Sequence, residues 1–172
     1  MSALDYGYLV MALLGVSLLA AVPGWTRVGR VIWPPFSTAV LLAALAIAGG
    51  APEVDVADNA RTAVAVALAG ALAMVGGGPV TTLLFRLADR RWLEPPDPPG
   101  SGGLWIGVLE RLAVFVSLVA AFPAGVAIAL GVKSLGAYHG LRDPGVARRF
   151  VIGTFASVLW ATACAGVILL AH

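Results

Sequence analysis

Long apolar runs, separated by short polar connectors, make up most of the chain. Four of these runs stand alone between connectors, at about residues 6–22, 34–49, 62–84 and 150–170. Runs of about 17–25 apolar residues are long enough to cross the hydrocarbon core of a bilayer. We therefore predict an all-α, polytopic membrane protein in which each run forms one transmembrane helix.

The run from Leu104 to Tyr138 is too long for one crossing. Its middle contains Pro123, and a proline disfavours helix at the residue before it. We predict a tight hairpin there, between a fourth and a fifth span. The result is a six-helix transmembrane bundle that forms one domain over residues 1–172. Residues 1–92 hold the first three spans, residues 93–103 form a linker rich in proline and glycine, and residues 104–172 hold the last three.

The segment GGGP, at residues 76–79, interrupts the third run. Three glycines and a proline weaken a helix. The span therefore either ends there or continues with a kink to about Leu84. The second alternative gives the length that a crossing needs.

The charges of the connectors support six crossings. The first, third and fifth connectors are basic, with Arg27 and Arg30, then Arg86, Arg90 and Arg91, then Arg142, Arg148 and Arg149. The second connector is mainly acidic and the fourth is uncharged. Positive loops stay in the cytoplasm, so this alternation predicts that both termini lie outside. Five of these arginines are expected to face lipid headgroups: Arg90, Arg91, Arg142, Arg148 and Arg149.

Composition agrees with a lipid environment and excludes several function classes. The chain is 60% hydrophobic and 12% charged, whereas soluble domains carry about 25% charge. A net charge of +2 without a basic-aromatic stretch gives no reason to expect a nucleic-acid partner. Cys164 is the one cysteine and lies in an apolar run, so we expect no disulfide, metal site or cofactor. The abundance of alanine, glycine, valine and arginine suggests a bacterial inner (cytoplasmic) membrane.

Two charges, Glu110 and Arg111, lie inside the otherwise apolar run WIGVLERLAVFVS. Glu110 precedes Phe122 by twelve residues and Lys133 follows Phe122 by eleven, which places both about 17 Å from the turn at about 1.5 Å per residue. Antiparallel helices would then bring Glu110 and Lys133 to one depth, with Arg111 at the same height. An ionised group near the bilayer centre costs about 2.5–3.5 kcal/mol. The cluster is therefore either a substrate-binding site or an ion pair that fixes helix register.

Small residues recur at every fourth position of the last run: Gly153, Ser157, Ala161 and Ala165. Such a stripe lets helices approach closely in lipid. The stripe packs on another helix of this chain or of a partner subunit, unless it arises by chance in an alanine-rich chain. A homo-oligomer or a partner membrane subunit is one expectation, beside membrane lipids.

Three segments of the C-terminal half, IGVLERL, GVKSLGAY and RRFVIGTFASVLWA, follow one another in order. They resemble the G-x-L-E-R, K-S and I-G-T-x-x-S segments of a family of small multi-pass bacterial membrane proteins of unknown function. The matching residues are Gly107, Leu109, Glu110, Arg111, Lys133, Ser134, Ile152, Gly153, Thr154 and Ser157. The N-terminal half does not match, because the family carries a histidine and an aspartate in its first span, whereas this chain has Asp5 and no histidine there. The resemblance implies a hairpin followed by a final span, and no activity.

Two functions are compatible with these features. The first is a non-enzymatic subunit or scaffold that binds lipid or a partner protein. It is favoured because the sequence has no phosphate-binding loop, metal cluster or acid-rich site. The alternative is a small transporter or enzyme for an anionic or lipid-linked substrate, in which Glu110 handles a proton while Arg111 and Lys133 hold a phosphate. A pocket that reaches Glu110 would favour the alternative, whereas a sealed pair would favour the first.

Overall fold

The computed structural model describes residues 2–26, 28–51, 59–88, 102–138 and 140–171. In chain order the α-helices are α1 (Ala3–Ala21), α2 (Trp33–Gly50), α3 (Asn59–Ala88), α4 (Gly102–Val119), α5 (Ala124–Ala137) and α6 (Pro144–Leu170). Two short 3-10 helices, η1 (Pro23–Trp25) and η3 (Gly140–Arg142), lie in connectors. The residues described contain no strand, so the all-α class is confirmed. Arg27, Arg90, Arg91, the acids of the second connector and most of the 93–103 linker lie outside the described residues.

Four helices in the described part of the chain are long and apolar enough to cross a membrane. They are α1 with η1 (Ala3–Trp25), α2, α3 from Ala60 and α6. α5 is apolar but has 14 residues, which is about 21 Å of helix against a hydrocarbon core of about 30 Å. That α4 and α5 also cross the membrane stays a prediction.

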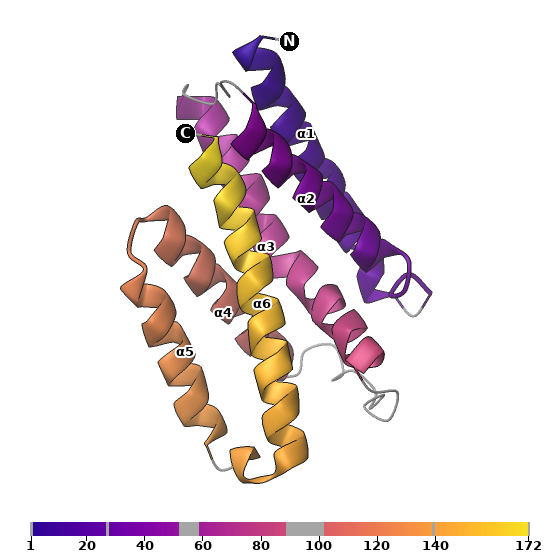
Figure 1. The fold of residues 1–172 in the computed structure, drawn as a ribbon, viewed down its shortest axis with the longest axis vertical. Helices are drawn as coiled ribbons and strands as arrows, with labels where there is room; N and C mark the ends of the chain where they lie inside the picture. Colours follow the sequence, from indigo (N-terminus) through magenta and orange to yellow (C-terminus); the bar gives the residue numbers. More distant parts are fainter. Residues whose placement is uncertain (1, 27, 52–58, 89–101, 139, 172) are drawn as a thin grey trace.

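The helices alternate in direction along the long axis of the molecule (Figure 1). Both termini lie toward one end, and the turn between α4 and α5 faces the same way. The connector between α1 and α2, the end of α3 and the connection from α5 to α6 lie at the other end (Figure 1). The arginines of the first, third and fifth connectors that the structure describes are therefore gathered at one end of the bundle.

The predicted hairpin is present and is closed by backbone hydrogen bonds. The Phe122 amide donates to the Ser117 carbonyl at 2.8 Å, and the Ala121 amide donates to the Leu118 carbonyl at 3.0 Å. This pattern is a Schellman motif, in which one residue takes a left-handed conformation. Here that residue is Ala121, with φ of 53°. α5 can follow closely because Gly125 lies beside α4, where an added Cβ would come within 2.3 Å of Ser117 Oγ.

Two helix starts differ from the prediction. α6 begins at Pro144, before the predicted start at residue 150. The side chain of Asp143 caps it by accepting from the Gly145 and Val146 amides at 2.7 and 3.1 Å, and proline suits the first helical position because its missing N–H needs no partner there. Arg148 and Arg149 consequently lie on a helix and not in a loop. α4 begins at Gly102, inside the predicted linker.

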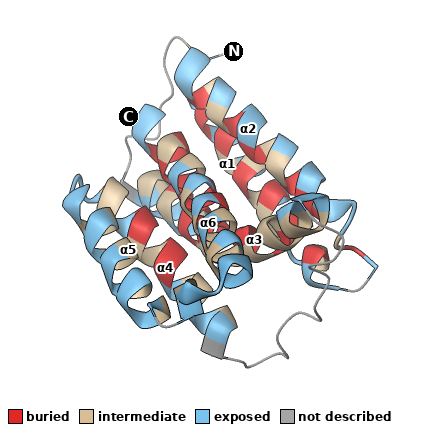
Figure 2. Cartoon of the chain, turned by 60° about the horizontal axis from the view of Figure 1, so that its bottom comes forward, coloured by how far each residue is buried: buried red, intermediate tan, exposed pale blue. Residues whose placement is uncertain are grey.

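The core lies where α6 packs against α2, α3 and α4 and where α1 packs against α2 and α3, as the buried positions in Figure 2 show. Its largest fully buried side chains include Leu14, Leu41 and Leu72. α5 is peripheral and has no buried residue. Two reciprocal hydrogen bonds join α1 to α2. Ser17 and Ser37 are buried, and the hydroxyl of each donates to the backbone carbonyl of the other.

Candidate functional site

The segment GGGP does not end the third helix. α3 continues through Pro79 to Ala88, as the second alternative expected. Proline has no N–H, so the Val75 carbonyl four residues earlier loses its helical donor. The indole Nε1 of Trp25 donates to this carbonyl at 3.1 Å. η1 is thereby attached to α3 at the weak point of the helix.

Two further α3 carbonyls accept from side chains of other helices. Arg111 on α4 donates to the Met74 carbonyl through Nε at 3.1 Å and through Nη2 at 2.8 Å. Trp160 on α6 donates through Nε1 to the Leu72 carbonyl at 3.0 Å. Of the three carbonyls, that of Val75 lacks its helical donor, whereas those of Leu72 and Met74 have the N–H groups of Gly76 and Gly78 four residues later. The side-chain bonds to Leu72 and Met74 are therefore second hydrogen bonds, which a carbonyl with two lone pairs can accept. Three elements therefore bind α3 through the carbonyls that precede Pro79.

The three glycines make room for these same three side chains. An added Cβ at Gly76 would lie 2.3 Å from Trp160 Cζ2, at Gly77 2.3 Å from Arg111 Cδ, and at Gly78 2.5 Å from Trp25 Cη2. Each glycine thus leaves space for the side chain of one hydrogen-bond donor. GGGP is therefore a packing surface for α6, α4 and η1, a role that its weak helix propensity did not indicate.

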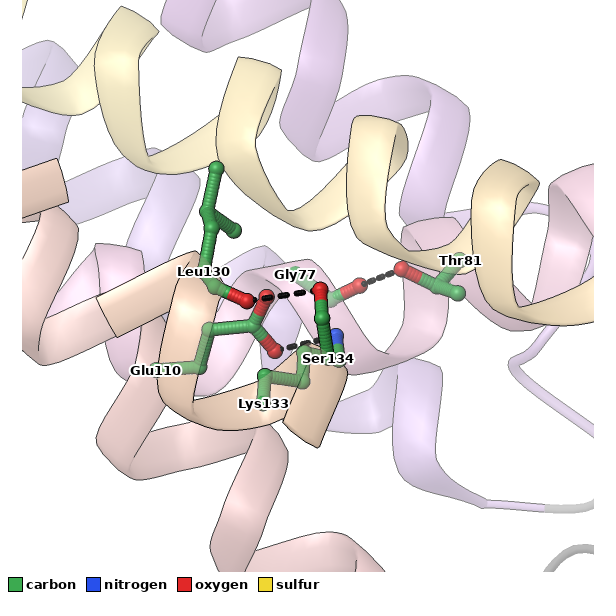
Figure 3. Close-up of polar contacts among 6 residues, drawn as sticks. All are labelled: Gly77, Thr81, Glu110, Leu130, Lys133 and Ser134. Atoms are coloured by element: carbon green, nitrogen blue, oxygen red, sulfur yellow. Dashed lines mark hydrogen bonds and ion pairs between the residues drawn. The ribbon is translucent and has the colours of Figure 1, made fainter. Parts of the chain in front are cut away.

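Glu110 and Lys133 form the expected pair. Lys133 Nζ donates to Glu110 Oε2, and the two side chains point toward one another from α5 and α4 (Figure 3). The Glu110 side chain is 5% exposed and that of Lys133 is 21% exposed. Lys133 Nζ also lies 5.4 Å from the centroid of the Phe150 ring on α6. The hairpin arithmetic therefore located both partners, and this pair is the main polar link between α5 and α4 that the described side chains show.

Arg111, the third member of the predicted cluster, points away from the Glu110–Lys133 pair and toward α3. The residue is 4% exposed, and its guanidinium lies against α3 at the Met74 carbonyl. Sequence position alone could not show this, because an arginine one residue from Glu110 points about 100° away around the helix. The Arg111 side chain can point toward α3 because Gly77 on α3 has no side chain and leaves space for it.

A cavity of about 1010 Å³ lies beside these residues. Its walls are residues 78–86 of α3, 103–111 of α4 and 149–157 of α6, with Lys133 of α5, Trp25 of η1 and Arg30. Each wall is about two helical turns long, and Arg86, Gly103 and Arg149 lie near the ends of their helices. The cavity therefore extends from the basic end of the bundle inward to the Glu110–Lys133 pair.

Cations dominate the charged side chains of the cavity. Among the described lining residues, the cations are Arg30, Arg86, Arg111, Lys133 and Arg149, and the one acid is Glu110. Hydroxyl groups contribute further polar surface, from Thr81, Thr82, Thr154 and Ser157. Those of Thr81 and Thr82 donate to the Gly77 and Gly78 carbonyls at 2.8 and 3.0 Å, so their oxygens remain acceptors toward the cavity.

Three buried polar atoms of the lining have no hydrogen-bond partner. They are Arg86 Nε, Glu110 Oε1 and Thr154 Oγ1. A buried donor or acceptor without a partner costs about 1–3 kcal/mol, and such groups in folded proteins usually meet water or a ligand. All three atoms belong to residues that line the cavity, next to the space in which a partner would be found.

The other predicted residues divide between the cavity and the surface. Arg149 lines the cavity, and its guanidinium lies 5.7 Å from the centroid of the Phe85 ring. Arg142 and Arg148 are exposed and do not line it. The stripe of small residues is used inside the chain: Ala161 and Ala165 are fully buried, and an added Cβ at Gly153 would lie 3.1 Å from Phe85 Cζ on α3.

The sequence prediction missed several cavity residues, notably Arg30, Arg86 and Thr154 on the walls. Arg30 and Arg86 were attributed to loops on charge grounds alone. A helix wheel that continued α3 through Pro79 would have placed Thr82 and Arg86 on one face, four residues apart.

Comparison of the chain with protein-family models, curated proteins and solved structures finds no match. The resemblance of the C-terminal half to a bacterial membrane-protein family stays a prediction. In its described residues the structure defines a coarser class, an all-helical protein with four helices long and apolar enough to cross a membrane and a cavity lined mainly by cations.

Proposed function

We propose that the protein is a small transporter or enzyme that binds an oxyanion, free or carried on a lipid, in this cavity. The observation that carries the proposal is that the cavity reaches Glu110 and Lys133 and is lined by five cations, Arg30, Arg86, Arg111, Lys133 and Arg149, against one acid. The sequence favoured a non-enzymatic subunit. A cavity that reaches the Glu110–Lys133 pair favours the transporter or enzyme instead.

The cations suit phosphate, sulfate or carboxylate oxygens. Guanidinium groups bind such oxygens in pairs, and bonds between ionised partners are about twice as strong as neutral ones. Arg86 Nε has an unused donor in the wall. Arg111 is held in place by Met74 through Nε and Nη2, which leaves Nη1 for a ligand. The hydroxyl groups of α3 and α6 complete a polar lining.

The arrangement in the membrane follows from the charges. The chain crosses a bacterial cytoplasmic membrane six times, with α4 and α5 as a hairpin and both termini outside. This topology is supported by the segments that hold Arg30, Arg86, Arg142, Arg148 and Arg149. They are the connector between α1 and α2, the end of α3 and the connection from α5 into α6, which lie at the end of the bundle opposite the termini (Figure 1). Positive loops stay in the cytoplasm. The cavity is then entered from the cytoplasmic side.

A scaffold role is the second candidate, and one feature favours it. α5 has no buried residue, and Ile128, Val132 and Leu135 on it are 60%, 66% and 78% exposed. A partner helix could cover this face, although lipid would cover it equally well. The scaffold role does not account for the cavity or for the unpartnered polar atoms on its walls.

Binding in a defined bilayer tests the proposal. The protein is reconstituted in phosphatidylcholine nanodiscs, sulfate and diethyl phosphate are titrated by calorimetry, and retention of phosphatidylglycerol is measured by native mass spectrometry. Lys133→Gln should weaken binding about tenfold or more, because a charge-assisted hydrogen bond contributes about 1.5–3 kcal/mol.

Arg142→Gln is the matched control, because Arg142 is exposed and lies outside the cavity lining. It should change binding by less than about twofold, as expected for a distant screened charge. Absence of binding by the wild-type protein to all three probes would contradict the proposal, and so would equal losses in the two variants. A stoichiometric partner protein without probe binding would support the scaffold role.

A further inference from the structure

Glu110 has two carboxylate oxygens with different surroundings. Oε2 accepts from Lys133 Nζ, whereas Oε1 is buried without a hydrogen-bond partner. Glu110 is among the residues that line the cavity, so a ligand that enters the cavity comes next to this residue. An ionised carboxylate with an unused oxygen is expensive away from water.

The charged neighbours of Glu110 come from every side of the cavity. Besides Lys133 on α5, the charged side chains that share the cavity with Glu110 are Arg111 on α4, Arg86 on α3, Arg149 on α6 and Arg30 beyond η1. Arg30, Arg86 and Arg149 lie toward the basic end of the bundle, where water screens them. At the inner end, Glu110 is the one negative group that faces Lys133 among the described residues, and it competes with any anion for the ammonium.

We propose that oxyanion binding in this cavity is coupled to the uptake of one proton by Glu110. The inference rests on the proposed function. The proton adds to Oε1 and makes a neutral carboxylic acid, and no other covalent bond changes. The hydrogen bond from Lys133 to Oε2 is exchanged for one from Lys133 to the ligand oxyanion. The new O–H of Glu110 then donates to a second ligand oxygen.

Charge balance gives the physical reason for the coupling. An anion that entered alone would leave two negative groups competing for one ammonium at the inner end of the cavity. When one anion and one proton enter together, the net charge of this region is unchanged. In a region of low dielectric constant this avoids the cost of an uncompensated charge. Protonation also converts Glu110 from a competitor of the ligand into a hydrogen-bond donor to it.

The sign of the pH dependence follows from proton counting. The bound state holds one more proton than the empty state, so binding is tighter at low pH. Binding that takes up one proton weakens about tenfold for each unit of rising pH. Glu110→Gln carries a neutral amide that can donate to the ligand in the same place. Its binding should not depend on pH over this range.

The test uses a probe that does not itself titrate. Diethyl phosphate keeps one negative charge between about pH 5 and pH 8, as phosphodiesters do, unlike phosphomonoesters, whose second pKa is about 6. Calorimetry in two buffers of different ionisation enthalpy, on the protein in phosphatidylcholine nanodiscs, counts the protons taken up on binding. Phosphatidylglycerol, also a phosphodiester, forms the lipid arm, with its retention measured by mass spectrometry across the same pH range.

The expected result is about one proton per bound anion for the wild-type protein and for Arg142→Gln, and none for Glu110→Gln. Glu110→Asp, which keeps a carboxylate, should retain the proton uptake if the glutamine variant does not fold. Coupling with diethyl phosphate identifies a soluble oxyanion as the ligand class, and coupling with phosphatidylglycerol alone identifies a lipid headgroup. Wild-type binding that is independent of pH and takes up no proton overturns this inference. Absence of binding contradicts the proposed function instead.

Discussion

Replacement of Gly77 by alanine tests the docking of α4 on α3. The added Cβ would lie 2.3 Å from Arg111 Cδ and 2.8 Å from Arg111 Nε, so the arginine has to leave the Met74 carbonyl. The lost bond to a charged group costs about 1.5–3 kcal/mol, and the crowding costs about 1–3 kcal/mol more. Alanine returns about 1 kcal/mol in helix propensity. The expected net loss is about 1.5–5 kcal/mol of unfolding free energy.

The measurement is unfolding in mixed micelles with rising dodecyl sulfate, followed by far-ultraviolet circular dichroism. Gly15→Ala is the matched control. Gly15 also lies inside a helix, α1, but an added Cβ there would have no atom within 4 Å. This variant should be unchanged or stabilised by up to about 1 kcal/mol. Equal stability of the Gly77 and Gly15 variants would refute the reasoning, since it would show that Arg111 does not depend on the space at Gly77.

The same unfolding assay checks three further variants. Ala121→Gly should stabilise the protein by about 1 kcal/mol, because glycine takes the left-handed conformation without a steric cost; a loss would count against the hairpin geometry. Trp160→Phe should lose about 1–3 kcal/mol, because the buried indole loses its hydrogen bond to the Leu72 carbonyl and a smaller ring is left in its space, whereas Trp105→Phe, at a residue 57% exposed, should lose under about 0.5 kcal/mol. Lys133→Gln alone should lower the unfolding free energy more than the double variant Lys133→Gln/Glu110→Gln, because the single variant leaves a buried charge without its partner. Additive effects of the two substitutions would show that the two side chains do not interact.

The sequence predicted the features that depend on local physics. Apolar runs long enough to span lipid are helices. The third run continues as a helix beyond GGGP, as predicted from the length that a crossing needs. The turn near Phe122 and the equal spacing of Glu110 and Lys133 from it were sufficient to pair two charges from separate helices. The predicted start of α6 at about residue 150 was wrong, because the apolar run begins there, whereas the helix begins at Pro144, after the capping side chain of Asp143.

The tertiary structure decided which polar groups meet. The sequence shows three glycines before Pro79 but not that Trp160, Arg111 and Trp25 fill the spaces they leave. It shows arginines near helix ends but not that Arg30, Arg86 and Arg149 share one cavity with Glu110. Helix length and apolar pattern are properties of consecutive residues, so the chain encodes them directly. The cavity and the partners of the α3 carbonyls depend on how helices distant in sequence pack and rotate, which no single segment determines.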